Sequence, residues 1–488
     1  MVELLHIVLA ENIDFSYERG EHLGFAYLAA ALRRSMVTVK IEEVHGFNDL
    51  DKIVINKPSI IGVSPFIHEF ASTANVCMQI KELLPNTIIV WGGVPTSSCV
   101  KQILQEFGVV DVIIHGDGEA VLVELALCIE NKKEYKQIAG IAYREGSKIV
   151  INPNRPAIME LDELPKPEHD MLNNPKITFA RVAASRGCYG YCTFCSAPHY
   201  FNREIGCKWR GHSINYVVDE MWDIYNRYHI REFFFSDASI EDPPGEKGIK
   251  RLEELADRIL SKEWDIFYHV FIRGESFGKE HIQLIHRLAC SGLEKVFIGV
   301  EAVTEHLMKL FQKRASLEQC IETYRIFRDE GILVEIGFIF FTPFSCMEDL
   351  IKQADFLHKM GIAGRFSYFF TQLEIYPDTP IKKILKQEGL LKENADYKDI
   401  YCYNFRDAMV KQVMQTIGKL KMSEMFSMLR DQSNTEIVLR RIQLHLGQEK
   451  TKEILEAWLS LQVRMNDYYF NCFMKIIHHV IYQNEESN

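Results

Sequence analysis

The sequence predicts an α/β protein in which two successive series of alternating strands and helices are followed by a helical region. Short runs rich in β-branched residues alternate with amphipathic helical patterns from residue 4 to residue 114. A second series of the same kind begins near residue 176, and the strand patterns end near residue 396. Such alternation is typical of parallel sheets that are covered by helices on both faces.

Composition limits the classes of protein to which the chain can belong. Its 488 residues are 47% hydrophobic and 25% charged, which are ordinary values for a soluble globular protein of several domains. The net charge of −11 argues against a nucleic acid as partner. The longest apolar run, residues 336–344, is too short to cross a membrane, so no membrane partner is predicted. We expect a cytoplasmic location, in which the 12 cysteines serve a purpose other than disulfides.

The first series predicts a Rossmann-like domain over residues 1–130. Its strands are expected at Leu4–Leu9, Val37–Ile41, Ile60–Ser64, Thr87–Trp91 and Val110–Ile114, and its clearest helices at Leu23–Arg34 and Phe70–Leu84. Right-handed βαβ units then give one parallel sheet. Glycine or serine ends three of the strands, at Ser64, at Gly92 and Gly93, and at Gly116 and Gly118. Ligands of such sheets bind at the carboxyl ends of the strands, although a tight turn explains any single glycine as well.

Residues 131–175 predict a connector between two domains. Ile138–Tyr143 and Lys148–Ile151 flank Glu145-Gly146, which indicates a hairpin. Four prolines follow, at positions 153, 156, 165 and 167, and they indicate an extended segment.

Residues 176–395 predict a second α/β domain. Six strands are expected, at Phe179–Ser185, Glu232–Ser236, Asp265–Arg273, Lys295–Val300, Val334–Phe340 and Arg365–Phe370. Six βα repeats are too few for an eight-fold barrel and indicate a partial (β/α)6 barrel. Barrels of this kind place their chemistry in the loops that follow the strands.

Residues 396–488 predict a helical C-terminal domain. Ser433-Asn-Thr-Glu436 has the pattern of a capping box and predicts the start of a helix. A later apolar stripe at three- and four-residue spacing predicts one long helix with a packing face, formed by Ile454, Trp458, Leu461, Met465, Tyr468, Cys472, Ile476 and Val480. We expect this domain to cover the barrel mouth and to select the substrate.

Three cysteines directly after the first strand of the second series are the strongest chemical signal. Cys188, Cys192 and Cys195 form C-x3-C-x2-C, so three thiolates on one loop can converge on one metal centre. A structural zinc site wants a fourth cysteine or histidine, and Cys207 and His199 lie downstream at no usual paired spacing. A three-thiolate [4Fe–4S] cluster instead leaves one iron open for a substrate. The spacing therefore favours the iron–sulfur cluster over zinc.

A C-x3-C-x2-C loop at the end of a first barrel strand resembles the radical S-adenosylmethionine (SAM) superfamily. Four further segments agree, namely Phe235-Ser-Asp-Ala-Ser-Ile240, Ile298-Gly-Val-Glu301, Gly337-Phe-Ile339 with Pro343, and Tyr376-Pro-Asp-Thr-Pro380. The resemblance implies that the SAM site includes Phe194, Ser236, Asp237, Glu301 and Ile339.

The chain departs from that superfamily pattern at three positions. Ala238, Ala302 and Phe341 stand where relatives carry an acid, a serine and a glycine. Arginines are further candidates for binding the SAM carboxylate, although salt bridges explain them equally well: Arg210, Arg273 and Arg365.

The N-terminal half resembles the cobalamin (B12)-binding domain that is fused to some radical SAM enzymes. The resemblance rests on four segments, His22–Leu32, Ile61-Gly-Val-Ser64, Gly92-Gly93 and Gly116-Asp-Gly-Glu119. It implies cobalamin contacts at Ser64, Gly92, Gly93, Gly116, Asp117, Gly118 and Glu119. The Asp-x-His-x-x-Gly signature that supplies an axial histidine elsewhere is absent after the first strand. His22 and His45 are the remaining candidates at strand-end loops, and both could simply be exposed.

The two resemblances together imply a cobalamin-dependent radical SAM enzyme. Its cofactors would be a [4Fe–4S] cluster, SAM and cobalamin, and an external donor such as flavodoxin or ferredoxin would supply the electron. SAM would be cleaved reductively to a 5′-deoxyadenosyl radical, and a methyl group would pass to an unactivated carbon of a small molecule such as a secondary metabolite. The catalytic side chains and the identity of the substrate are not predicted.

Three alternatives stay open at this stage. The first is a radical SAM rearrangement, cyclisation or deoxygenation in which the B12 domain is unused or does not methylate. The second is a methylthiotransferase acting on tRNA, which would need further cysteines at strand ends, whereas Cys77 and Cys128 fall within helical patterns. The third, from another class, is an iron–sulfur redox sensor, which would not need the segments around Glu301 and Gly337.

Overall fold

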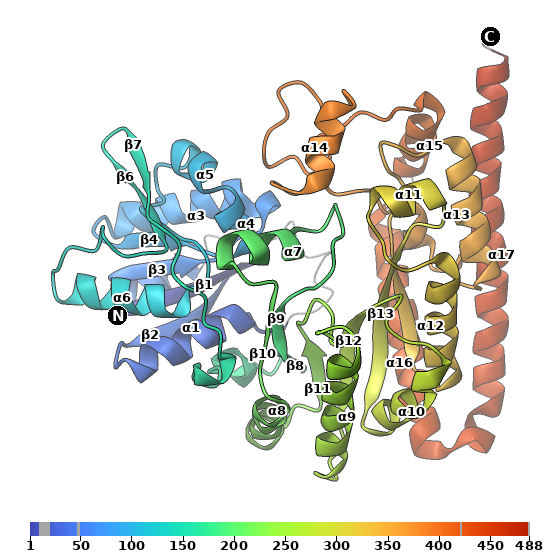
Figure 1. Cartoon of the computed structure of the whole chain (residues 1–488), viewed down its shortest axis with the longest axis horizontal. Coiled ribbons are helices and arrows are strands. Elements are labelled where there is room, and N and C mark those ends of the chain that lie inside the picture. Colours follow the sequence, from blue (N-terminus) through green and yellow to red (C-terminus); the bar gives the residue numbers. More distant parts are fainter. Residues whose placement is uncertain (9–19, 46–48, 420–421, 487–488) are drawn as a thin grey trace. The chain divides into compact units, whose positions relative to one another are not determined.

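The computed structural model describes residues 1–8, 20–45, 49–419 and 422–486 (Figure 1). The chain divides into two compact units. The first contains Met1–Gly190, Cys195–Val270 and Asp396–Asp399, and the second contains Tyr191–Phe194, Phe271–Ala395 and Ile400–Asn488. The division into four ranges that the sequence suggests stays a prediction.

The first unit contains a seven-stranded sheet with the order β2-β1-β3-β4-β5-β6-β7. Its strands are β1 Val2–Val8, β2 Val39–His45, β3 Ile60–Val63, β4 Ile88–Trp91, β5 Val112–Ile114, β6 Ile141–Glu145 and β7 Lys148–Ile151. The first five are parallel, as predicted, and Leu9 of the predicted first strand lies outside the described residues. The predicted hairpin forms as β6 and β7, and it extends this sheet because β6 pairs antiparallel with β5.

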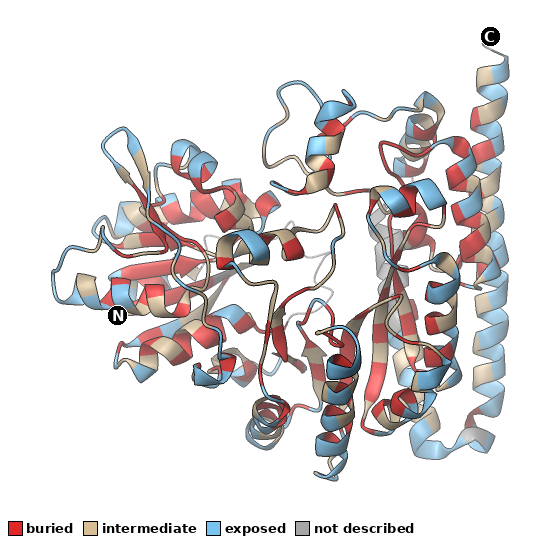
Figure 2. Ribbon diagram, in the orientation of Figure 1, coloured by how far each residue is buried: buried red, intermediate tan, exposed pale blue. Residues whose placement is uncertain are grey.

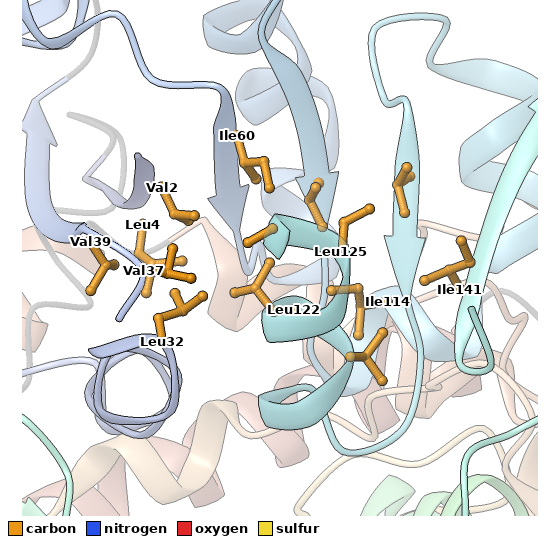
Figure 3. Close-up of a cluster of buried hydrophobic side chains, with 14 of the residues drawn as sticks. Val2, Leu4, Leu32, Val37, Val39, Ile60, Ile114, Leu122, Leu125 and Ile141 are labelled. Atoms are coloured by element: carbon orange, nitrogen blue, oxygen red, sulfur yellow. The ribbon is translucent and has the colours of Figure 1, made fainter. Parts of the chain in front are cut away.

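Helices cover both faces of this sheet. They are α1 Leu23–Arg34, α2 Leu50–Asn56, α3 Phe70–Leu83, α4 Val94–Ser98, α5 Val100–Glu106 and α6 Glu119–Glu130. Leu32 of α1 and Leu122 of α6 pack with Leu4 of β1 in one core cluster (Figure 3). Side chains alternate along β4, so Trp91 faces the other way and contacts Phe70 of α3 with ring centroids 5.6 Å apart. Each large apolar side chain buried in this way stabilises the fold by about 1.5–3 kcal/mol.

The second βα series contains parallel strands separated by helices. The strands are β8 Phe179–Val182, β11 Glu232–Phe235, β12 Phe267–Arg273, β13 Leu293–Glu301 and β14 Leu333–Phe338. Strand β11 pairs with β8 and with β12, and β13 pairs with β14, all in parallel. The helices between them are α8 Ile214–Tyr228, α9 Glu246–Leu260, α10 Ile282–Cys290 and α12 Leu317–Asp329, and α13 Met347–Lys359 follows β14. A short antiparallel pair, β9 Ser185–Gly187 with β10 Trp209–Gly211, precedes α8.

The sixth strand predicted at Arg365–Phe370 is wrong. Phe366–Phe370 forms a 3-10 helix, η8, and the only pairing recorded nearby within the described chain is one parallel bridge between Phe341 and Gln372. The Tyr368 hydroxyl accepts a hydrogen bond from the Ile336 amide of β14, at 3.2 Å. A side chain therefore satisfies a backbone donor that a sixth strand would otherwise satisfy, and the aromatic residues that suggested a strand are buried as core.

Helices follow the second series. They are α14 Pro380–Gln387, α15 Ala408–Gly418, α16 Met422–Leu446 and α17 Gln448–Glu485. The helix start predicted at Ser433 is wrong, because the backbone is already helical from Met422 and stays so through Glu436. A capping-box sequence is also compatible with a helix interior when helical residues continue on its N-terminal side.

The predicted long helix forms as α17, but its packing face is offset from the predicted stripe. Asn466, Phe473 and Ile477 are buried, whereas Tyr468 is 64% and Ile454 52% exposed. Much of α17 is exposed to solvent (Figure 2). The apolar spacing identified the helix, and the neighbours α13, α15 and α16 determine which side is buried. Among the described residues, none of the helices combines the length and apolar character that a membrane crossing requires.

Candidate cluster and cofactor site

The loop with the three cysteines begins at the end of β9. Gly187 has a φ of +108°, and a Cβ there would lie 2.0 Å from the Lys208 carbonyl oxygen, so only glycine fits. The Cys188 amide donates to that same carbonyl at 2.9 Å, and Cys195 stands at the N-cap of α7, Ser196–Tyr200. The local backbone thus gives the loop a defined entry and exit.

The donor chemistry of this loop fits a three-thiolate cluster. Cys188, Cys192 and Cys195 are thiols, not halves of disulfides. Within the described residues, no group of three or more cysteine, histidine or acidic side chains is arranged to hold a metal ion. Metal binding commonly completes the folding of such a loop, because the ligands must deprotonate and come together.

The centre of the loop, Tyr191–Phe194, belongs to the second unit. Thr193 donates from its amide to the Phe311 carbonyl at 3.1 Å and from its hydroxyl to the Leu310 carbonyl at 2.8 Å. The Phe194 ring packs edge-on against Phe311, with centroids 5.1 Å apart. Phe194 and Ile339 lie in one apolar cluster, so the structure brings together two of the residues predicted for the SAM site.

Glu301, another predicted SAM residue, forms a buried ion pair that the sequence reasoning missed. Lys313 lies 3.9 Å from the Glu301 carboxylate and donates to the Gly299 carbonyl at 2.8 Å. Burial raises the pKa of Glu301, while Lys313 acts in the opposite direction. Burial disfavours the charged form of Lys313, but Glu301 and Cys192 outweigh it and raise the pKa of this lysine. Nothing in the spacing of Lys313 identified it, because its pairing depends on tertiary structure.

Two glycines make room for the Glu301 carboxylate. A Cβ on Gly337 would lie 3.0 and 3.1 Å from its two oxygens, and a Cβ on Gly299 would lie 2.8 Å from one of them. Glu301 itself has a φ of +69°, which is unusual for a residue other than glycine. The segments Ile298-Gly-Val-Glu301 and Gly337-Phe-Ile339 therefore both leave space for this buried acid, and Gly337 also adjoins the Phe297 ring.

The two residues predicted after the second strand have different surroundings. Ser236 is exposed, whereas the buried Asp237 accepts hydrogen bonds from the Ala184 amide at 2.8 Å and the Ser185 hydroxyl at 2.5 Å. Burial raises the pKa of Asp237 to about 6. The acid that reaches the cysteine loop is Asp242, which accepts from the Tyr189 amide at 3.0 Å and which the sequence reasoning did not identify.

The residues predicted to contact cobalamin lie at the carboxyl ends of three neighbouring parallel strands. Ser64 follows β3, Gly92 and Gly93 follow β4, and Gly116–Glu119 follows β5. Gly93 has a φ of +92°, and a Cβ there would lie 2.4 Å from the Ser64 hydroxyl oxygen. Glycines at this edge leave the backbone accessible to a large ligand, so the residues fit the predicted cofactor.

Several charged candidates are already paired within the protein. The Asp117 carboxylate binds Arg210 and Glu119 binds Arg186, so a cobalamin contact at these positions would fall to the backbone. Arg365 pairs with Glu335 and Glu436, and Arg273 lies 3.5 Å from Glu275.

The two histidines considered as axial ligands have local partners. The His22 side chain caps α1 by accepting from the Phe25 amide at 3.2 Å. The His45 ring lies 2.7 Å from the Glu43 carboxylate. Each local contact gives the histidine a role in its own element.

Comparison with known proteins finds two matching family models. Residues 182–357 match the Radical SAM superfamily. Residues 15–126 match the B12 binding domain. The chain therefore combines a radical SAM region with a B12-binding domain, and the resemblance seen in the sequence is confirmed.

Individual relatives and solved structures extend the likeness over most of the chain. It is 27% identical over 352 residues to an uncharacterised methyltransferase of Pyrococcus horikoshii, covering 70% of this chain and 74% of that protein. It is 29% identical over 422 residues to the anaerobic magnesium-protoporphyrin IX monomethyl ester cyclase of Rubrivivax gelatinosus, covering 81% and 70% respectively. The cobalamin-dependent S-adenosylmethionine radical enzyme OxsB has a TM-score of 0.73 at 18% identity, over 99% of this chain and 80% of that chain. This structural likeness shows a shared fold.

Proposed function

We propose that the protein is a cobalamin-dependent radical SAM enzyme that transfers a methyl group to an unactivated carbon of a small molecule. Cys188, Cys192 and Cys195 would hold a [4Fe–4S] cluster, and the strand ends at Ser64, Gly92–Gly93 and Gly116–Glu119 would hold cobalamin. When bound, the cluster supplies the electron that cleaves SAM, and cobalamin carries the methyl group.

The observation that carries this proposal is the direct contact between the two candidate cofactor loops. The Arg186 side chain, two positions before Cys188, donates to Glu119 at 2.6 Å. The Tyr200 hydroxyl, at the end of the helix that Cys195 caps, donates to the Gly116 carbonyl at 3.3 Å. A redox sensor has no need of a strand-end ligand site beside its cluster loop, so these contacts favour the enzyme.

Side chains near Cys192 support a SAM site. Glu301 and Lys313 present one anionic and one cationic group, which are complementary to the ammonium and the carboxylate of an amino acid. The apolar cluster of Phe194 and Ile339 offers a surface on which an adenine can pack. In this proposal the residues bind and orient SAM and exclude water.

The second candidate function is cyclisation, rearrangement or deoxygenation with a B12 domain that does not methylate. The likeness to the Rubrivivax cyclase favours it, just as the likeness to the Pyrococcus methyltransferase favours methyl transfer. Flavodoxin or ferredoxin as electron donor, a cytoplasmic location and substrate selection by the C-terminal helices stay predictions.

Anaerobic reconstitution tests the proposal. The wild-type chain is loaded with iron, sulfide and hydroxocobalamin, and its iron content, EPR spectrum and visible spectrum are recorded. Strong reductant and SAM should then yield 5′-deoxyadenosine, whereas a variant with all three cysteines changed to alanine should lose the EPR signal and this product together. With a substrate, equal amounts of S-adenosylhomocysteine and 5′-deoxyadenosine indicate radical methyl transfer, and 5′-deoxyadenosine alone indicates the second candidate. A full cluster that leaves SAM intact under these conditions would contradict both.

A further inference from the structure

Two arginines that lie opposite each other on the β9–β10 pair form ion pairs with acids of the loop that follows β5. Arg186 and Arg210 are directly paired across the antiparallel ladder, which places both side chains on one face. Arg210 forms a two-point contact with the Asp117 carboxylate, at 2.6 and 3.1 Å. Arg186 reaches Glu119 at 2.6 Å and Asp117 at 3.4 Å.

These contacts are largely buried, and the residues that form them have further partners. The Arg210 side chain is 1% exposed and also donates to the Ile158 carbonyl at 2.7 Å. Asp117 accepts from the Ile158 amide as well, at 3.3 Å. The Arg186 guanidinium lies over the Tyr27 ring of α1, 4.8 Å from its centroid. Burial opposes ionisation of Asp117, but Arg210 and Arg186 outweigh burial and lower the pKa of this carboxyl. The Asp117 carboxylate therefore stays ionised near neutral pH.

The loop after β5 belongs to the candidate cobalamin site, and the two arginines lie next to the candidate cluster site. Gly116 and Gly118 belong to the predicted cobalamin contacts, and Arg186 stands one residue before Gly187, whose backbone fixes the direction in which Cys188 leaves β9. The Tyr200 hydroxyl adds a third contact, on the Gly116 carbonyl, from the far side of the cysteine loop. The cysteine loop is thus flanked on both sides by residues that hold the same strand-end loop.

We infer that Arg186 and Arg210 are positioning residues that fix the cobalamin-binding loop at a set distance from the cluster-binding loop. This inference rests on the proposed function. Arg186 already pairs with Glu119 and Asp117, and Arg210 already pairs with Asp117 and the Ile158 carbonyl, so we do not assign either arginine to the carboxylate of SAM or of a substrate. Substitution of either arginine should leave both cofactors bound, but the distance between the cluster and cobalamin should become more variable. Misplacement by about 1 Å can reduce the rate of a reaction between two bound groups roughly a hundredfold.

The test compares the wild-type chain with R186Q, R210Q and E119Q, and with R203Q as the matched control. Arg203 also forms an ion pair, with Glu204 at 2.6 Å, but its side chain is 43% exposed. Arg186→Lys keeps the charge without the guanidinium fork, and serves as the conservative variant. Iron and cobalamin contents are measured first, because a positioning role requires that both stay within about twofold of wild type.

The first readout is magnetic and reports the distance directly. Cob(II)alamin and a reduced cluster are both paramagnetic, so the cluster accelerates relaxation of the cob(II)alamin EPR signal, and this effect falls steeply with separation. We expect the acceleration to fall several-fold and to become heterogeneous in R186Q and R210Q, less so in R186K, and not at all in R203Q. A double variant R186Q/E119Q should be no worse than R186Q alone, because the two residues act through one contact.

The second readout is hydrogen–deuterium exchange of residues 112–119 in the apoprotein, which requires neither cofactor. Faster exchange in R186Q, R210Q and E119Q, with R203Q unchanged, is the expected result. Wild-type relaxation in cofactor-loaded R186Q and R210Q, together with unchanged exchange, would overturn the inference. Failure of the proposed function would give a different result. If the wild-type chain bound no cobalamin, the exchange of residues 112–119 would still differ between the wild-type chain and the variants.

Discussion

Replacing Lys313 by methionine should destabilise the protein through the acid it leaves behind. The Lys313 and Glu301 side chains are 5% and 15% exposed, so the variant buries an uncompensated carboxylate. Removing one partner of a buried ion pair costs about 3–5 kcal/mol. The 3.9 Å separation places this pair at the lower end, so we expect a loss of about 3 kcal/mol, or roughly a hundredfold in the unfolding equilibrium.

The loss of stability in K313M should depend on pH. Burial raises the pKa of Glu301 above its ordinary value of 4.5, and loss of Lys313 raises it further. Since the folded state then binds the proton more tightly than the unfolded state, stability is lost as the pH rises above 4.5. The deficit of K313M should therefore be smaller at pH 5 than at pH 8, and K313M/E301Q should recover most of the loss without this pH dependence.

Urea unfolding of the reduced apoprotein measures these differences. The matched control is K309M, because Lys309 pairs with Glu305 at 2.6 Å but both side chains are more than three-quarters exposed. Its effect should stay within about 0.5 kcal/mol. A K313M variant as stable as K309M, or a double variant without recovery, would refute the buried-pair reasoning.

Three further predictions concern two glycines, Gly187 and Gly93, and the buried acid Asp237. Gly187→Ala should lower the free energy of unfolding by at least about 2 kcal/mol and lower the iron content after reconstitution, because its Cβ would meet the Lys208 carbonyl. The control Gly206→Ala should cost less, because Gly206 also has a positive φ but has open space around its Cβ position. Gly93→Ala should lower cobalamin retention and the melting temperature, and Ser64→Gly in the same chain should restore part of both, since Ser64 is the group that the new Cβ meets. The pKa of Asp237 is raised to about 6, so its protonation stabilises the folded state, and that contribution is lost as the pH rises from about 4 to 6. Asp237→Asn should flatten the unfolding free energy across this window by about 3 kcal/mol, and an unchanged pH profile would contradict it.

The sequence was sufficient for features that depend on local pattern. Alternating apolar runs predicted the five parallel strands of the first sheet, and the cysteine spacing predicted the superfamily. The sixth strand at Arg365–Phe370 failed because aromatic residues favour strands and buried 3-10 segments alike, and the Tyr368 hydroxyl takes over a backbone donor of β14. Pattern does not distinguish these outcomes when burial is complete.

Pairings across long separations were beyond the sequence. Arg210 was considered as a ligand for a carboxylate, and its carboxylate proved to be Asp117, far away in the chain. Asp242 and Lys313 carry no motif, and only tertiary structure brings them to the cysteine loop or to Glu301. The offset packing face of α17 has the same origin, because the helix repeat identifies apolar positions and the neighbouring helices decide which of them are buried.

The accommodation of Glu301 by Gly299 and Gly337 restricts how this part of the protein can evolve. Neither Gly299 nor Gly337 carries a side chain, and a methyl group at either position would meet an oxygen of the Glu301 carboxylate. A shorter residue at position 301 would leave this space unfilled. A larger residue at either glycine would force the Glu301 carboxylate to move away from its present position. Among homologues we expect positions 299 and 301 to covary, so a lineage that lacks the acid should carry a larger residue at position 299, whereas the Phe297 ring also confines position 337.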